Sequence, residues 1–222
     1  MPPMIPFSNR EQAGRALAER LAQAASWSGA LVLALPRGGV PVAYEVADRL
    51  GLELDILVVR KLGTPGNPEL AMGAIASGGV RVMNEDIVHY SHASHAEIEG
   101  TVIQESHELQ RRERAYRGDR PRPVIQDRAV ILVDDGLAPR APKRAAVQAV
   151  HKLGAGSVTV AVPVGAPESV AQLEQLADRV VCLHLPHDLY AIGRWYVNFD
   201  QTSDRQVMDL LQQAWSRGGE PA

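Results

Sequence analysis

The sequence predicts an α/β protein with a doubly wound, mainly parallel sheet, and three features lead to that prediction. Short apolar runs recur along the chain of 222 residues. Stretches with helical spacing of apolar residues separate most of these runs. The runs do not alternate between apolar and polar residues, which is typical of parallel strands covered by helices on both faces. The predicted strands are 31–35, 55–59, 129–133, 158–162 and 180–183.

The first part of the chain predicts a helix, a strand and a second helix. Apolar residues between 13 and 24 repeat at three- and four-residue steps, and Ser8 or Asn9 can cap the helix that they form. The strand at 31–35 leads into the turn Pro36-Arg37-Gly38-Gly39, after which helical spacing continues to Gly51.

The middle of the chain is less core-like. The strand at 55–59 ends at Arg60-Lys61 and a turn-rich segment, and residues 73–76 and 80–83 are short enough to be two further strands. From 84 to 118 the composition turns polar and charged, and apolar positions there indicate a long surface helix. The strand at 129–133 is followed by a helix with Pro142 in its first turn and Gly154 after its end.

Composition excludes several classes of function. The 23 Lys and Arg against 26 Asp and Glu give a net charge of -3, which provides no global positive field for nucleic acid or an anionic membrane. Residues 1–7 carry no basic residue and no apolar stretch suited to a secretory signal, and no apolar run reaches the roughly 18 residues of a membrane span. Cys182 is the one cysteine, so an internal disulfide is impossible. We therefore expect a cytoplasmic protein with a small-molecule ligand.

The most informative motif is the pair Asp134-Asp135, which follows a buried strand and precedes a helix. Carboxylates in that place can accept hydrogen bonds from a sugar diol or hold a hard cation such as Mg²⁺, and the following helix N-terminus offers donors to a phosphate. An acidic cap on the helix is the simpler alternative.

Two other strand ends carry residues suited to phosphate. In Arg37-Gly38-Gly39, the glycines allow close backbone approach and Arg37 offers a planar fork to phosphate oxygens. Arg60 and Lys61 add two cations after the next strand. An ordinary turn and a solvated strand end are the respective alternatives.

Four segments give the chain a resemblance to a known family. They read ALPRGGVPVAYEVA, DILVVRKLGTPGNPELAMGAIASGG, RAVILVDDGLA and AIGRWYVNFDQ. In this order they resemble a type I phosphoribosyltransferase, and more narrowly a bacterial group of predicted phosphoribosyltransferases. The resemblance runs from about Phe7 to Leu211. It implies one phosphoribosyltransferase-like domain over 1–222, with a helical insertion at 84–118 and a small C-terminal hood at 184–200.

The resemblance also implies a substrate, 5-phosphoribosyl 1-pyrophosphate with Mg²⁺, and transfer of its phosphoribosyl group to a small nitrogenous acceptor such as a purine-like base. Asp134 and Asp135 would be catalytic, would hold the ribose hydroxyls, and would bind the metal through water or the ribose diol. The residues expected to bind substrate are Arg37, Gly38, Gly39, Arg60, Lys61, Gly136, Leu137, Ala138, Arg140, Ala141, Lys143 and Tyr190.

The phosphate loop departs from the family pattern. Relatives continue with a Thr-Gly-x-Thr loop, where this chain has Pro139 and Pro142 in place of the threonines and Arg140 in place of the glycine. Each proline removes a backbone donor, and a hydrogen bond to a charged group contributes about 1.5 to 3 kcal/mol. Arg140, Lys143 and Arg144 offer cations that can hold an anion instead, or are simply solvated.

Three further features have two readings each. Four of the ten aromatic residues lie between Tyr190 and Phe199, so Tyr190 can stack on an acceptor base, or the segment forms a small core or a homodimer contact. His89, His92 and His95 lack a companion acid or cysteine at zinc spacing, which favours a solvated face. Glu69 is an acid in a segment that could cover the site, and its role as a general base is unsupported.

Three functions remain open. The first is the phosphoribosyltransferase itself. The second is a catalytically silent ribose-phosphate-binding or nucleotide-binding regulatory protein, which the altered phosphate loop favours. The third is a sugar-phosphate hydrolase, in which water replaces the acceptor.

Overall fold

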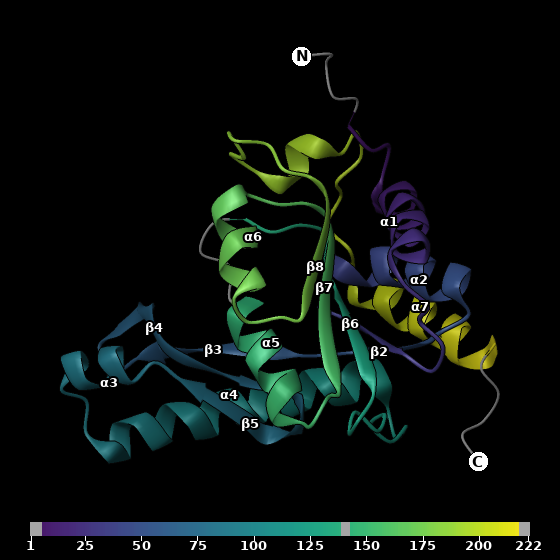
Figure 1. The fold of residues 1–222 in the computed structure, drawn as a ribbon. Coiled ribbons are helices and arrows are strands. Elements are labelled where there is room, and N and C mark those ends of the chain that lie inside the picture. Colours follow the sequence, from purple (N-terminus) through teal and green to yellow (C-terminus); the bar gives the residue numbers. More distant parts are fainter. Residues whose placement is uncertain (1–5, 139–142, 218–222) are drawn as a thin grey trace.

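The computed structural model describes residues 6–138 and 143–217. It contains a five-stranded sheet in the order β2-β1-β6-β7-β8 and a three-stranded sheet in the order β3-β4-β5. All neighbouring strands of the larger sheet are parallel. Helices lie on both of its faces (Figure 1). The predicted doubly wound, mainly parallel α/β fold is confirmed.

The larger sheet reverses its winding direction beside β1. Its strands are β1 (Leu31–Ala34), β2 (Glu53–Ile56), β6 (Ala129–Val133), β7 (Ser157–Val164) and β8 (Arg179–His184). Strand β1 pairs with β2 on one side and with β6 on the other, so that Ala34 lies opposite both Ile56 and Val133. Open parallel sheets bind ligands at the carboxyl ends of the strands where such a reversal occurs.

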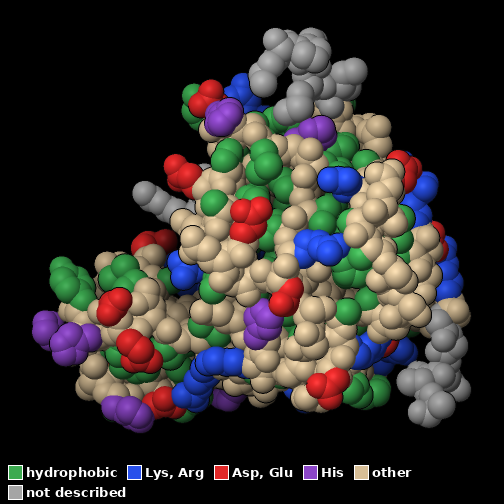
Figure 2. Space-filling model, in the orientation of Figure 1, with side chains coloured by type: hydrophobic (Ala, Val, Ile, Leu, Met, Phe, Trp, Pro, Cys, Tyr) green, Lys and Arg blue, Asp and Glu red, His purple; other side chains and the backbone are tan. Residues whose placement is uncertain are grey.

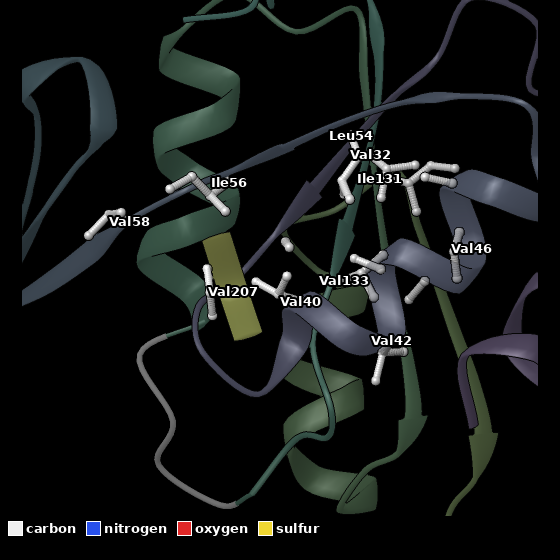
Figure 3. Close-up of a cluster of buried hydrophobic side chains, with 14 of the residues drawn as sticks. Val32, Val40, Val42, Val46, Leu54, Ile56, Val58, Ile131, Val133 and Val207 are labelled. Carbon is white, nitrogen blue, oxygen red and sulfur yellow. The ribbon is translucent and has the colours of Figure 1, made fainter. Parts of the chain in front are cut away.

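Two apolar cores cover the faces of this sheet. Helices α1 (Arg10–Ala24), α2 (Gly39–Leu50) and α7 (Asp204–Arg217) pack on one face, and α5 (Lys143–Lys152) and α6 (Pro167–Glu174) pack on the other. Val32 and Ala34 of β1 belong to the first core, which Figure 3 shows, whereas Leu31 and Leu33 belong to the second. Successive side chains of a strand point to opposite faces of the sheet. Since an apolar core covers each face, both sets of side chains are apolar and the run does not alternate with polar residues.

The smaller sheet takes up part of one predicted strand, whose bounds were therefore wrong. Its antiparallel strands are β3 (Val59–Thr64), β4 (Asn67–Ala76) and β5 (Val80–Met83). The predicted strand at 55–59 is divided, because β2 ends at Ile56 and β3 begins at Val59. Between them, the backbone N–H of Val58 donates to the Ser77 hydroxyl at 2.9 Å, which ties this stretch to the end of β4. Arg60 and Lys61 therefore lie within β3 and do not follow a strand of the larger sheet.

Two helices occupy the segment between β5 and β6. They are α3 (Glu85–Ser91) and α4 (His95–Arg117), and α4 begins with a capping box between Ser94 and Glu97. The inner face of α4 is more buried than its polar composition suggests, since Tyr116 and the charged Arg117 are both buried. Arg117 donates to Asp55 of β2, with 2.7 Å between Nη2 and Oδ1. This ion pair offsets the free-energy cost of burying the guanidinium.

The last strand leads into a segment that returns to the start of α1. A short 3₁₀ helix (Ile192–Trp195) follows β8, and Tyr196 then bridges to Phe7. Within the described residues, no helix is both long and apolar enough to span a membrane. Figure 2 shows acidic and basic side chains interspersed over the visible face.

Candidate active site

A pocket of about 230 Å³ lies at the carboxyl ends of β1, β2 and β6. This is the edge of the sheet at which the winding reverses. The lining residues come from segments that are far apart in the sequence. They are Leu35, Pro36, Leu57, Val58, Val59, Arg112, Tyr116, Asp134, Asp135, Gly136, Ala138, Lys143, Ala146 and Ile192.

Asp134 is buried at the end of β6 and is held on both carboxylate oxygens. Its Oδ1 accepts the backbone N–H of Asp135 at 2.8 Å, and its Oδ2 forms an ion pair with Nζ of Lys143. Burial lowers the pKa of Lys143 to about 7. The negative charge of Asp134 acts in the opposite direction and favours the charged amine.

Asp135 is bound to α1 and to the hood segment. Nε of Arg10 donates to its Oδ2 at 3.0 Å, and the hydroxyl of Tyr196 donates to its backbone carbonyl at 2.7 Å. Burial raises the pKa of the Asp135 carboxyl, and the positive charge of Arg10 opposes that rise. The Arg10 guanidinium lies 3.9 Å from the ring centroid of Phe199. The hood segment therefore also contacts the arginine that pairs with Asp135.

The two glycines after β1 allow this turn to approach the acids. A β-carbon on Gly39 would lie 2.8 Å from the carbonyl oxygen of Val133 and 2.9 Å from Cα of Asp134. A β-carbon on Gly38 would lie 2.8 Å from Cγ of Asp135. Both distances are below the contact that real side chains make, so only glycine fits here without a shift. The turn therefore packs against the acid pair, but Gly38 and Gly39 do not line the pocket, and their role in binding stays a prediction.

Comparison with known proteins shows the family of this chain. The family model for a phosphoribosyl transferase domain matches residues 7–194. The chain belongs to the phosphoribosyl transferase domain family. Two Mycobacterium tuberculosis proteins, one from strain CDC 1551 and one from strain H37Rv, are provisionally named phosphoribosyl transferases. Each is 48% identical over 208 residues, covering 94% of this chain and 47% of the relative. The chain thus spans about half the length of these curated relatives.

A solved structure shows the same fold over nearly the whole phosphoribosyl transferase domain. The crystal structure of TT1426 from Thermus thermophilus is 42% identical in sequence, with a TM-score of 0.84. The match covers 94% of this chain and 98% of that chain.

Some residues predicted to bind substrate in this phosphoribosyl transferase domain line the pocket, and others do not. Gly136, Ala138 and Lys143 line it together with the two acids. Leu137 does not, because its side chain is fully buried in the core under α5. Its N–H donates to Val164 and its carbonyl accepts from Ala166, so its backbone is committed to the neighbouring strand and loop. Arg140 and Ala141 lie outside the described residues, as do Pro139 and Pro142.

Arg37 follows the lining residue Pro36 but does not line the pocket itself. It precedes α2, and Nη1 lies 3.7 Å from Oδ1 of Asp204 at the start of α7. The hydroxyl of Tyr116 donates to the same oxygen at 2.7 Å. Burial and this hydrogen bond raise the pKa of Tyr116 to about 12. Asp204 therefore links the turn after β1 to helix α4.

The structure does not bring Arg60, Lys61 or Tyr190 into the pocket. Arg60 pairs with Glu105 of α4 at 2.7 Å, and Lys61 lies 3.6 Å from Glu69, whose side chain is almost fully exposed. Tyr190 is also exposed, and it is Ile192 of the hood segment that lines the pocket. The roles of these residues in binding stay predictions.

Sequence reasoning missed Arg10, Arg112 and Tyr116 as site residues, and it gave Tyr196 no role at Asp135. None of the four segments that carry the resemblance covers Arg10 or α4, and the polar composition of 84–118 indicated a solvent-exposed helix. One signal was available, because Arg112 and Tyr116 are four residues apart and must share a helix face.

The donor set fits a hard cation that is bound mainly by its substrate. Asp134 and Asp135 offer carboxylate oxygens, the ligands that Mg²⁺ prefers, and Mg²⁺ typically takes one or two protein carboxylates plus phosphate oxygens. Among the described residues, no group of three or more His, Cys, Asp or Glu side chains could hold a metal ion by itself. His89, His92 and His95 are exposed and form no such group.

Proposed function

We propose that the protein binds 5-phosphoribosyl 1-pyrophosphate with Mg²⁺ and transfers its phosphoribosyl group to a small nitrogenous acceptor, with purine-like bases as the first class to test. One observation carries this proposal. Adjacent carboxylates of Asp134 and Asp135 line a pocket at the winding reversal of the sheet, in contact with the turn at Gly38-Gly39. Membership of the phosphoribosyl transferase domain family supports the same reaction class.

In the proposed reaction, an acceptor nitrogen forms a bond to C1 of the ribose while the bond from C1 to pyrophosphate breaks. The pyrophosphate leaves with the electron pair, and the acceptor nitrogen releases its proton to solvent. Positive charge develops on the ribosyl ring as these bonds exchange. The buried carboxylates of Asp134 and Asp135 are fixed beside the ring and stabilise that charge, and they also accept hydrogen bonds from the ribose hydroxyls.

Mg²⁺, when bound, would neutralise charge on the pyrophosphate. Asp134 and Asp135 would hold it through water or the ribose hydroxyls, and Lys143 with the backbone at Gly136 and Ala138 would contact the 5-phosphate. The N-terminus of α5 adds a favourable dipole for an anion at that end of the pocket.

The first experiment is calorimetric titration with phosphoribosyl pyrophosphate and Mg²⁺, together with an assay of pyrophosphate release in the presence of a panel of nitrogenous acceptors. We expect binding and acceptor-dependent release, and loss of release in Asp135→Asn. Asp127→Asn is the matched control, because Asp127 is exposed in a turn before β6 and should behave as wild type. Absence of binding to the wild-type protein would contradict the proposal, and release without an acceptor would indicate a hydrolase.

The second candidate is a silent ribose-phosphate-binding or nucleotide-binding protein, and the sequence Pro139-Arg140-Ala141-Pro142 favours it. This candidate predicts binding without release. The variant that carries Pro139→Thr, Arg140→Gly and Pro142→Thr restores the family pattern. If phosphoribosyl pyrophosphate binds only to this variant, the native chain is not a phosphoribosyltransferase.

A further inference from the structure

Helix α4 contributes a guanidinium to the pocket, from outside the four segments that carry the family resemblance. Arg112 and Tyr116 both line the pocket, and they are one helical turn apart on the same face. Among the described residues, the ion-pair partner of Arg112 is Glu108, whose Oε1 lies 2.8 Å from Nε. This contact uses the Nε edge of the guanidinium, so the other N–H groups of Arg112 have no hydrogen-bond partner within the described chain.

Arg112 lies close to the turn that carries Arg37. The Tyr116 hydroxyl is hydrogen-bonded to Asp204, which also pairs with Arg37. The positive charges of both Arg112 and Arg37 act on the Tyr116 hydroxyl and oppose the rise of its pKa. Two guanidinium groups, one from the turn after β1 and one from α4, therefore lie near Tyr116, and only that of Arg112 lines the pocket.

The size of the pocket suggests which part of the substrate meets Arg112. Its volume of about 230 Å³ is below the roughly 300 to 1,000 Å³ of typical ligand pockets. With the ribose beside Asp134 and Asp135 and the 5-phosphate at Lys143, the lining residues left for the pyrophosphate include Pro36, Arg112 and Tyr116. Lys143 is assigned to the 5-phosphate in this arrangement, so the pyrophosphate needs another cation.

We propose that Arg112 binds the pyrophosphate group together with Arg37, and that the insertion helix α4 thereby supplies part of the leaving-group site. This inference rests on the proposed function. A planar guanidinium suits phosphate oxygens because it donates two parallel hydrogen bonds, and its charge favours departure of an anionic leaving group. Asp204 holds the Arg37 side chain near Tyr116 when no anion is bound.

The test compares Arg112→Gln with Arg111→Gln. Both arginines pair with Glu108, but the side chain of Arg111 is 68% exposed and does not line the pocket. Calorimetry would measure binding of Mg²⁺-pyrophosphate, of Mg²⁺-phosphoribosyl pyrophosphate and of ribose 5-phosphate to each protein. We expect Arg112→Gln to weaken the two pyrophosphate ligands about 10- to 100-fold and to leave ribose 5-phosphate nearly unchanged. Arg111→Gln should leave all three unchanged, and Arg112→Lys should retain part of the affinity.

Two patterns of weakened binding would overturn the inference. One is equal weakening of pyrophosphate binding in Arg112→Gln and Arg111→Gln, which would mean a long-range charge effect. The other is an equal loss of ribose 5-phosphate binding in Arg112→Gln, which would mean general damage to the pocket. If the wild-type protein binds phosphoribosyl pyrophosphate and Arg112→Gln binds it equally well, the inference fails and the proposed function stands. If the wild-type protein binds none of the three ligands, both fail.

Discussion

Gly38 and Asp135 lie so close together that a β-carbon on Gly38 would be 2.8 Å from Cγ of Asp135. The two residues are almost a hundred positions apart in the sequence, and each belongs to a different motif that we predict to bind phosphate or sugar. Their contact shows that the turn after β1 and the acids after β6 are packed as one unit. Substitutions in the turn should therefore act on the acids.

Gly38→Ala should affect ligand binding more than stability. The atoms in the way are the end of the flexible Asp135 side chain, whose carboxylate must shift from its present position beside Arg10. We expect weaker binding of phosphoribosyl pyrophosphate with Mg²⁺ and a loss of less than about 1.5 kcal/mol in the free energy of unfolding. Calorimetry and urea denaturation measure the two effects, and unchanged ligand affinity would contradict the prediction.

Gly39→Ala should instead destabilise the fold. The obstructing atoms belong to the backbone of Val133 and Asp134, which cannot rotate away. We expect a loss of about 1 to 3 kcal/mol in the free energy of unfolding. Gly100→Ala is the matched control, because nothing lies within 4 Å of the added carbon in the middle of α4 and the change should stabilise by about 0.5 to 1 kcal/mol. If both substitutions change the free energy of unfolding equally in urea denaturation, the close approach of Gly39 to Val133 and Asp134 does not exclude a side chain there.

Arg10→Met should produce a pH-dependent loss of stability. Arg10 opposes the burial that raises the pKa of Asp135, so its removal raises that pKa further. When the pKa of a carboxyl is raised in the folded state, its contribution to the free energy of unfolding is greatest below its ordinary pKa of about 3.9. That contribution is lost as the pH rises through the folded-state pKa. The loss should therefore be about 3 kcal/mol at neutral pH and should shrink toward pH 4.

The control for Arg10 is Arg15→Met on the same helix, where a half-exposed arginine pairs with Glu45. It should cost little at any pH, since exposed ion pairs contribute about 1 kcal/mol or less. Denaturation profiles at several pH values compare the two variants. If the loss of unfolding free energy in Arg10→Met does not change with pH, Arg10 does not act through the pKa of Asp135, and the prediction is wrong.

Lys143→Met should remove a rise of stability with pH. The pKa of Lys143 lies at about 7 in the folded protein, against an ordinary value of about 10.4. Between these values the unfolded chain binds a proton that the folded protein has released, so the free energy of unfolding increases with pH. From about pH 7 to pH 9 we expect a gain of about 2 kcal/mol in the wild-type protein and none in Lys143→Met. Lys61→Met, outside the pocket, should keep the wild-type slope, and parallel slopes in all three proteins would contradict the prediction.

Arg117→Met should be strongly destabilising, because the side chains of Arg117 and Asp55 are only 5% and 2% exposed. Removing the arginine leaves a buried carboxylate without its main partner, which typically costs about 3 to 5 kcal/mol. The double variant Asp55→Leu with Arg117→Met should lose less than the single variant. Arg205→Met, from an exposed pair with Asp209, should change the free energy of unfolding by less than about 1 kcal/mol. Thermal and chemical denaturation of all three would measure these differences, and a double variant less stable than the single one would show that the pair is not the cause.

Local patterns predicted the elements well. The strand at 129–133 was predicted with the bounds that β6 has, and Asn9 caps α1 through the backbone N–H of Gln12, because both depend on neighbours within a few residues. The predicted strand at 55–59 was wrong because its end does not depend on neighbouring residues alone. An apolar run does not show where one sheet ends and the next begins, since the boundary at Val58 depends on Ser77.

The sequence by itself determined the fold class, the succession of strands and helices, and the placing of Asp134 and Asp135 directly after a buried strand. Only the tertiary structure decided which side chains share the pocket. It brought Arg112 into the pocket and Arg10 against Asp135, and it left Arg60 in the second sheet with Glu105. The physical reason is range: strand and helix patterns arise from neighbours in the chain, whereas a site arises from the order in which distant strands pair. Here β1 lies between β2 and β6, and no spacing in the sequence encodes that order.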